Sequence, residues 1–205
     1  MRTVVIANTG VKEEFCGQEQ KNDGIEWHSE PGEMDDVDLV VDFLFTPGKD
    51  RIEQLKKSGA ELVIVNQVGG TTKSLPENFI RFNGWPGFLG GKFIEAASAS
   101  TGLNNKVESF FARFGKDIRW VPDQPGFISA RIVAMIINEA YLALGEGVSS
   151  REEIDTAMKL GTNYPLGPFE WAKRIGPAHV KDLLMDLAAM NNRYQPAPSL
   201  IGESE

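Results

Sequence analysis

The sequence predicts a protein of two domains, in which an α/β domain with a parallel sheet (residues 1–122) precedes an all-helical domain (residues 123–205). Three apolar runs without polar alternation, at residues 3–7, 37–45 and 61–68, are typical of strands that are buried on both faces of a parallel sheet. The pattern between the last two runs is helical, which gives a strand–helix–strand unit. From about residue 124 onward the apolar residues follow helical spacing.

The remaining elements of the first domain follow from shorter patterns. Ile52 and Leu55 share one face of a helix over residues 49–58, and Gly59 ends it. A second helix is predicted over residues 103–114, and further strands are predicted at residues 24–27, 79–88 and 118–121. No regular element is predicted for the mostly polar segment 11–22.

The second domain is expected to be organised around residues 123–147, DQPGFISARIVAMIINEAYLALGEG. Apolar side chains recur on every side of this segment, which predicts a helix that is buried all round. Ser150 to Glu153 has the form of a capping box and begins a helix that Gly161 stops. Two more helices are predicted at residues 169–175 and 178–190, and the tail from Pro196 is expected to be loose.

Composition limits the class of protein. The chain is 41% hydrophobic and 24% charged, as is ordinary for a globular protein, and its formal net charge is −8. This charge argues against nucleic acid or an anionic membrane as a partner. Cys16 is the only cysteine, so no intramolecular disulfide forms, and the N-terminal apolar run is too short for a signal segment. We therefore expect a cytoplasmic protein without a membrane span.

Motifs of the second half, taken in order and spacing, resemble the C-terminal domain of the 3-hydroxyacyl-CoA dehydrogenase family. They are Asp123-Gln-Pro-Gly-Phe-Ile, Arg131-Ile, Asn138-Glu-Ala, Glu146-Gly, Ile154-Asp-Thr-Ala-Met, Gly161 and Tyr164-Pro-Leu-Gly-Pro-Phe-Glu170. The resemblance implies that this helical domain follows a nucleotide-binding domain, forms much of a dimer interface and helps to hold an acyl-CoA.

The first half resembles the same family at fewer positions. Asp38-Leu-Val-Val is similar to a family strand, Val65-Asn66 to the start of an S-N-T-S segment, and Lys92–Glu95 to a K-L-V-E segment. The implied fold is a reduced Rossmann-like parallel-sheet domain followed by an all-helical domain of the 3-hydroxyacyl-CoA dehydrogenase C-terminal type. NAD is the cofactor implied by the resemblance, and Glu95 and Asn66 are the surviving catalytic positions.

Two requirements of the family's reaction, the NAD-dependent oxidation of a 3-hydroxyacyl-CoA, are altered in this chain. The family seats the pyrophosphate in a G-x-G-x-x-G loop, but here Gly10 is the one glycine after the first strand. The family's base is a histidine in an H-F-F-N-P segment, and Pro86 aligns with it, although proline moves no proton. Glu26 is the candidate for a ribose-binding acid, and the glycine loop at residues 69–70 is interpreted as a turn.

Other side chains offer few substitutes for these groups. His28 and His179 are interpreted as surface residues, and with a single cysteine they give no metal-ligand spacing. The Tyr164–Phe169 turn is interpreted as a segment that shapes the chain between helices and not as a ligand contact.

The main hypothesis is therefore a 3-hydroxyacyl-CoA dehydrogenase-like protein that has lost hydride transfer and retains a site for an acyl-CoA-like small molecule. One alternative is an active NAD-dependent dehydrogenase with a rearranged site that uses Glu95 and Asn66. Another alternative is a non-enzymatic interaction subunit that dimerises through the helical domain. A helical domain of modest size favours a homodimer.

Overall fold

A computed structural model describes residues 2–17, 24–32 and 34–204 of the chain. The chain forms two compact units, Met1–Phe127 and Ile128–Glu205. The division lies five residues beyond the boundary predicted after residue 122. None of the helices in the described residues is both long and apolar enough to span a membrane.

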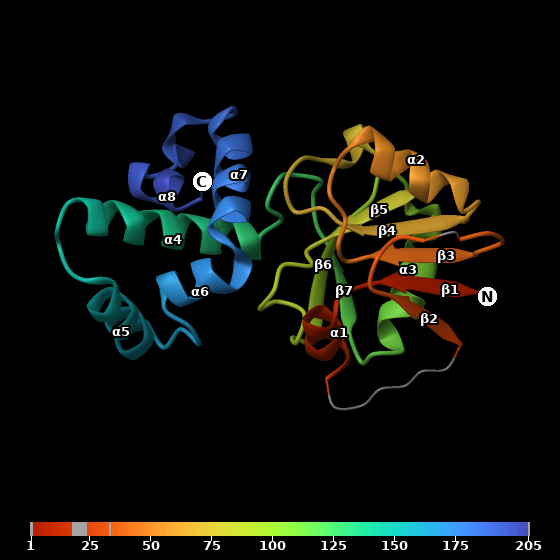
Figure 1. Cartoon of the computed structure of the whole chain (residues 1–205), viewed down its shortest axis with the longest axis horizontal. Coiled ribbons are helices and arrows are strands. Elements are labelled where there is room, and N and C mark those ends of the chain that lie inside the picture. The colour runs from red at the N-terminus through yellow and green to blue at the C-terminus, as the bar shows by residue number, and fades with distance from the viewer. Residues whose placement is uncertain (1, 18–23, 33, 205) are drawn as a thin grey trace. The chain divides into compact units, whose positions relative to one another are not determined.

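The first unit contains a sheet of seven strands in the order β2-β1-β3-β4-β5-β6-β7 (Figure 1). The strands are β1 (Thr3–Ile6), β2 (Ile25–His28), β3 (Leu39–Asp42), β4 (Leu62–Asn66), β5 (Phe79–Phe82), β6 (Phe93–Ala97) and β7 (Asp117–Trp120). Neighbouring strands are parallel except for β5 and β6, which are antiparallel with Phe82 opposite Ala96. Strand order reverses at β1, which pairs with both β2 and β3, and such reversal points are where open α/β sheets bind ligands.

Helices cover both faces of this sheet (Figure 1). They are α1 (Thr9–Cys16), α2 (Lys49–Lys57) and α3 (Asn104–Ala112), with short 3-10 turns η1 (Thr72–Ser74) and η2 (Thr101–Leu103). Phe15 of α1 and Phe110 and Phe111 of α3 pack in one apolar cluster with Val5 and Val41 of the sheet. Leu55 of α2 packs in a second cluster, on the opposite face of the sheet.

The predicted strands and the helices α2 and α3 are confirmed, whereas two elements were not predicted. In α1, Phe15 is the buried residue, so the segment carries little apolar periodicity. Residues 18–22 of the predicted polar segment lie outside the described residues. β6 begins with an exposed Phe93 and includes the charged Glu95, so it lacks a continuous apolar run. The strand predicted to continue to residue 88 ends at Phe82, because the glycine-rich segment that follows forms turns.

The second unit is helical. Its helices are α4 (Ser129–Gly145), α5 (Arg151–Thr162), α6 (Pro168–Ile175), α7 (Pro177–Ala188) and α8 (Pro198–Glu203), with the 3-10 turn η3 (Asn192–Tyr194) before α8. The capping box at Ser150 is confirmed, because its hydroxyl accepts the Glu153 N–H and Glu153 bonds back to the Ser150 N–H. The prediction that α4 is buried all round is wrong, because Ile132 is 52% exposed and Glu139 is also exposed.

The prediction of a loose tail is also wrong. Asn138 of α4 donates from Nδ2 to Gln195 O (3.0 Å), and its Oδ1 accepts the Ala197 N–H (2.8 Å). Ala197 and Leu200 are fully buried against the other helices. The tail sequence is short and rich in proline, but its hydrogen bonds with Asn138 and the burial of Leu200 help to dock it as α8.

Candidate functional site

Asn66, the last residue of β4, fixes the loop that follows β5. Its side-chain Nδ2 donates to the carbonyl oxygens of Phe43 (3.0 Å) and Gly84 (3.2 Å), and its Oδ1 accepts the Gly84 N–H (3.0 Å). A Cβ added at Gly84 would lie 2.6 Å from Asn66 Cγ, so a glycine is required there. Both ends of the Asn66 amide are therefore used to join the ends of three strands.

Glu95 of β6 meets the same loop from the neighbouring strand. Its backbone carbonyl accepts the Asn83 N–H (2.9 Å), and Asn83 Nδ2 lies 3.4 Å from Glu95 Oε2. The structure therefore brings both predicted site residues, Asn66 and Glu95, to the consecutive residues Asn83 and Gly84.

The buried side chain of Asn83 contacts the Glu95 carboxylate. Sequence reasoning aligned Pro86 with the family's histidine and missed Asn83. The antiparallel pairing of β5 with β6 makes Asn83 and Glu95 neighbours, and this pairing could not be foreseen because β6 was not predicted. A carboxamide does not accept a proton near neutral pH, so Asn83 cannot act as the base that the family's histidine provides.

The turn between β1 and α1 is the place at which the resemblance would seat a pyrophosphate. Asn8 caps α1, and its Oδ1 accepts the Val11 N–H (2.9 Å). A Cβ added at Gly10 would have its nearest neighbour, Asn8 Oδ1, at 3.7 Å, an ordinary contact, so no protein atom requires a glycine there. The turn therefore has one glycine where the dinucleotide fingerprint has three.

Glu26 does not lie at the end of β2. It pairs with Val4 in the middle of β1, and the strand continues to His28. Its carboxylate accepts two hydrogen bonds from the Arg2 guanidinium (2.9 and 3.2 Å), and this contact lowers the pKa of Glu26. Neither Gly10 nor Glu26 therefore fits the dinucleotide seat that the resemblance implies.

The glycine loop after β4 is held by a buried arginine. Gly70 has a φ of +68°, as a turn glycine does, and the Thr72 N–H and hydroxyl both donate to the Asp123 carboxylate (2.9 and 2.8 Å). Arg81 of β5 is fully buried and donates from Nε to Asp123 (2.7 Å). Its other nitrogens donate to the carbonyl oxygens of residues 67, 68 and 124. The Asp123 carboxylate thus accepts the hydrogen bond of the Thr72 amide in this loop. Arg81 links the segment before α4 to the sheet.

A second buried ion pair lies at the end of β3. Asp42 is fully buried, and its Oδ2 accepts from Arg51 Nε (2.8 Å) while its Oδ1 accepts the Leu44 N–H (3.0 Å). Burial raises the pKa of Asp42 to about 6, although the nearby Arg51 opposes the shift. Both carboxylate oxygens have partners, so the pair holds α2 on the sheet.

The Tyr164–Phe169 turn of the helical unit is held by two acidic side chains. Asp155 Oδ1 accepts the Phe169 N–H (2.8 Å), and Glu170 Oε2 accepts the Gly167 N–H (2.9 Å). A Cβ at Gly167 would lie 2.3 Å from Asp155 Oδ1. These contacts support the interpretation of the motif as a segment that shapes the chain.

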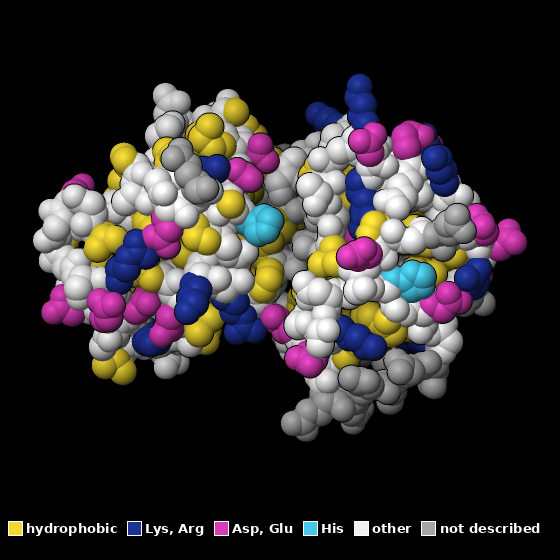
Figure 2. Space-filling view, in the orientation of Figure 1, with side chains coloured by type: hydrophobic (Ala, Val, Ile, Leu, Met, Phe, Trp, Pro, Cys, Tyr) yellow, Lys and Arg dark blue, Asp and Glu magenta, His cyan; other side chains and the backbone are white. Residues whose placement is uncertain are grey.

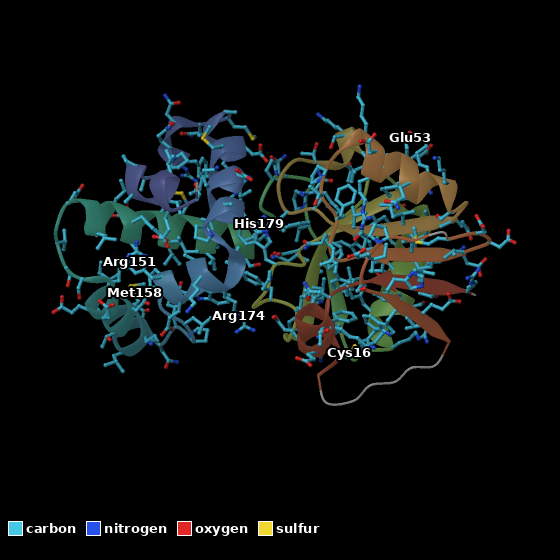
Figure 3. All side chains as sticks on the ribbon, in the orientation of Figure 1. Cys16, Glu53, Arg151, Met158, Arg174 and His179 are labelled. Carbon is cyan, nitrogen blue, oxygen red and sulfur yellow. The ribbon has the colours of Figure 1, made fainter. Side chains whose placement is uncertain are left out.

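The histidines and the cysteine lie at separate elements. His28 ends β2, and Figure 3 labels His179 in α7 and Cys16 at the end of α1. Burial raises the pKa of the Cys16 thiol. No group of three or more His, Cys, Asp and Glu side chains in the described part of the chain is placed to hold a metal ion.

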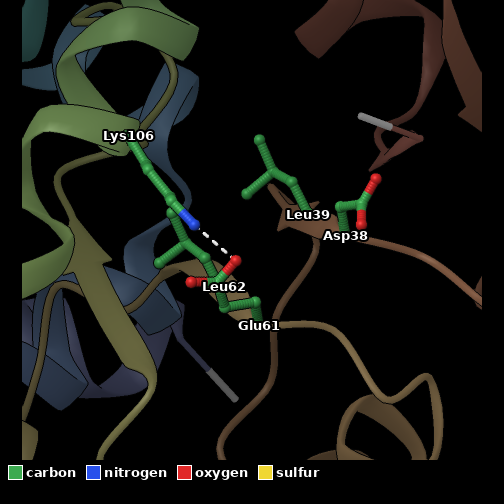
Figure 4. A pocket seen from close by; sticks show the side chains of 5 residues that line it. All are labelled: Asp38, Leu39, Glu61, Leu62 and Lys106. Atoms are coloured by element: carbon green, nitrogen blue, oxygen red, sulfur yellow. Dashed lines mark ion pairs between the residues drawn. The ribbon is translucent and has the colours of Figure 1, made fainter.

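A cavity of about 280 Å³ lies at the amino-terminal ends of β3 and β4 (Figure 4). It is lined by Asp38, Leu39, Glu61, Leu62 and Lys106. Glu61 and Lys106 form an ion pair across it. The cavity is separate from the Asn66, Asn83 and Glu95 cluster, which lies at the other ends of the strands.

Among the residues that the structure describes, the surface shows no segregation of charge on the face seen in Figure 2, where acidic and basic side chains are interspersed.

Comparison with known proteins relates this arrangement to one family. Residues 126–204 match the family model of the 3-hydroxyacyl-CoA dehydrogenase C-terminal domain. The chain is 38% identical over 117 residues to 3-hydroxyadipyl-CoA dehydrogenase of Escherichia coli K12. The aligned region covers 55% of this chain and 25% of that protein. The chain is 40% identical over 96 residues to 3-hydroxybutyryl-CoA dehydrogenase of Bradyrhizobium diazoefficiens. This aligned region covers 46% of this chain and 33% of that protein.

Residues 126–204 therefore form a domain of the 3-hydroxyacyl-CoA dehydrogenase C-terminal type, and the chain as a whole is similar to 3-hydroxyacyl-CoA dehydrogenases. It spans only a quarter to a third of the two curated relatives just named. The crystal structure of (S)-3-hydroxybutyryl-CoA dehydrogenase PaaH1 from Ralstonia eutropha superposes with a TM-score of 0.70 at 26% identity, over 87% of this chain and 69% of that one. The structure of Mycobacterium tuberculosis FadB2 gives a TM-score of 0.71 at 15% identity, a similarity of fold alone. The predicted fold class, a Rossmann-like sheet domain followed by a helical family domain, is confirmed.

Proposed function

We propose that this 3-hydroxyacyl-CoA dehydrogenase-family protein has lost hydride transfer and retains a site for an acyl-CoA-type ligand. The observation that carries the first part is the Asn83 carboxamide, which lies 3.4 Å from the Glu95 carboxylate. Oxidation of a 3-hydroxyl group needs a base that takes up its proton. Neither an amide nor an already hydrogen-bonded Asn66 supplies that base.

The turn after β1 supports the same conclusion. Asn8 caps α1 with its own side chain, Gly10 stands in an open environment and Glu26 is paired with Arg2. NAD is the cofactor that the family resemblance implies, but these residues do not fit its usual seat.

The ligand part of the proposal rests on the helical unit. The family match covers residues 126–204, and the relatives named above are dehydrogenases of 3-hydroxyadipyl-CoA and 3-hydroxybutyryl-CoA. A coenzyme A thioester is therefore the ligand class to test.

Activity is tested by following NADH absorbance with acetoacetyl-CoA at high protein concentration. We expect a flat trace for the wild type, because the Asn83 side chain that contacts Glu95 is a carboxamide and takes up no proton. A decay that disappears in Glu95→Ala would contradict the proposal and support the alternative of an active dehydrogenase that uses Glu95 and Asn66.

Ligand binding is tested separately by calorimetry with acetoacetyl-CoA and with NADH. We expect heat of binding for the thioester and none for NADH. Absence of thioester binding would overturn the ligand part and leave the loss of hydride transfer intact. Binding of NADH would show that the altered turn after β1 still accepts a dinucleotide.

The second candidate function is an interaction subunit that dimerises through the helical domain. Exposed apolar side chains favour it, because Ile132 of α4 is half exposed and Leu160 of α5 is 83% exposed. Sedimentation at micromolar concentration tests it, with Ile132→Asp as the variant and Glu139→Gln as its control on the same helix. A monomeric wild type would contradict a homodimer.

A further inference from the structure

The loop that joins β5 to β6 is closed by one carboxylate from a distant helix. Glu14 of α1 accepts with Oε1 from the backbone N–H groups of Gly87 (2.7 Å), Leu89 (3.0 Å) and Gly90 (3.4 Å). Three backbone amides therefore converge on one oxygen, contributed by a side chain more than seventy residues away in the sequence.

The carbonyl groups of the same loop are bound by a cation. Lys116, which precedes β7 and is buried, donates from Nζ to Leu89 O and to Gly91 O (3.1 Å for the latter). Leu89 itself is fully buried in the apolar cluster with Phe15. The loop is thus held by Glu14 through its amides, by Lys116 through its carbonyls and by Leu89 through packing.

The backbone of the loop is suited to binding an anion. Gly87 has a φ of +100°, a conformation that side-chain-bearing residues rarely adopt, and it turns its N–H toward Glu14. A Cβ at Gly90 would lie 3.8 Å from Glu14 Cγ, so the carboxylate-bearing chain packs directly on the loop. Successive backbone N–H groups that point into one concavity bind carboxylate and phosphate oxygens in many proteins.

We propose that the amides of Gly87, Leu89 and Gly90 form an oxyanion-binding site for which Glu14 is the built-in ligand. A small carboxylate then occupies the site when the Glu14 side chain is removed. The loop that joins β5 to β6 starts at Asn83, so occupancy of this site also sets the position of the Asn83–Gly84 segment. This inference does not depend on the proposed loss of hydride transfer.

The test is chemical rescue of Glu14→Ala in the full chain. Hydrogen exchange of the Gly87 and Leu89 amides is measured with formate and, at the same ionic strength, with chloride. We expect exchange to become about tenfold faster or more in the variant, since charge-assisted hydrogen bonds are lost. Formate, but not chloride, should restore protection; phosphate in a parallel sample shows whether the site also accepts a larger oxyanion.

Protection that is unchanged in Glu14→Ala, or restored equally by chloride, would overturn the proposal. Glu14→Gln provides a second variant in case Glu14→Ala fails to fold. It keeps one neutral acceptor oxygen, so we expect intermediate protection, and formate should add little. Glu13→Ala is the matched control, because Glu13 is an exposed acid on the same helix. The control should leave exchange at both amides unchanged.

Discussion

The helical unit and the sheet unit both contain residues that match the 3-hydroxyacyl-CoA dehydrogenase family. Different physical requirements constrain the matching residues in the two units. In the helical unit, Asp155 and Asn138 satisfy buried backbone groups, so their loss would leave unpaired N–H and carbonyl groups. In the sheet unit, Glu95 now lies beside Asn83. Packing constrains a residue whatever the reaction is, whereas a catalytic side chain is constrained by the reaction alone. A strong match in the helical unit therefore reports a shared core and does not by itself establish a shared reaction.

The largest expected effect comes from Arg81→Met in the sheet unit. The substitution leaves Asp123 and the carbonyl oxygens of residues 67, 68 and 124 without their buried cation. We expect a loss of about 3–5 kcal/mol in the free energy of unfolding, measured by urea denaturation. Lys49→Met, at an exposed lysine, is the control and should change little. An equally small effect for Arg81→Met would show that the sheet unit does not depend on this ion pair.

Gly167→Ala tests the corresponding close contact in the helical unit. The added methyl group would lie 2.3 Å from Asp155 Oδ1 and would displace the oxygen that accepts the Phe169 N–H. We expect the free energy of unfolding to fall by about 2–4 kcal/mol. Gly161→Ala, also in this unit, is the control: no neighbouring atom lies within 4 Å of the added Cβ, and alanine favours the helix. Equal stabilities for the two variants would contradict the role given to Asp155.

Asn138→Ala tests whether the Asn138 hydrogen bonds hold α8 against the rest of the helical unit. Loss of the carboxamide leaves Gln195 O and the Ala197 N–H unpaired in a buried setting. We expect a loss of about 1–3 kcal/mol, with faster amide exchange in α8. Glu139→Ala, an exposed neighbour on α4, should leave α8 unchanged. Normal protection of α8 in Asn138→Ala would show that burial of Leu200 alone docks the tail.

An effect similar in size to that of Asn138→Ala is a pH dependence that belongs to the sheet unit. Burial raises the pKa of Asp42 to about 6 in the folded chain, above its ordinary unfolded value of about 3.9. The stability that Asp42 contributes is therefore present below the unfolded pKa and is lost as pH rises through the folded pKa. The stability of the wild type relative to Asp42→Asn should fall by on the order of 2 kcal/mol between about pH 4 and pH 7. A stability difference that is constant over this range would contradict the raised pKa.

The elements predicted correctly from the sequence are those with a continuous apolar run or a complete capping motif. The apolar runs gave β1, β3 and β4, and the Ser150 capping box gave the start of α5. It missed α1 and β6, because each has few buried apolar residues in its short span. It selected Asn66 and Glu95 but not Asn83, because contacts across strands depend on register, and register is fixed by tertiary pairing.

The contact between Gly84 and Asn66 has a consequence for how the sequence can change over evolutionary time. Any side chain at residue 84 would overlap the Asn66 amide, which lies 2.6 Å from the added Cβ. A smaller residue at position 66 would remove this overlap, although Phe82 Cε2 would still lie 2.8 Å from the added Cβ, and it would release the ends of β3 and β5. The two positions are therefore epistatic: Gly84→Ala should cost less stability when residue 66 is already alanine, and a double-mutant cycle on Gly84→Ala and Asn66→Ala should show this coupling.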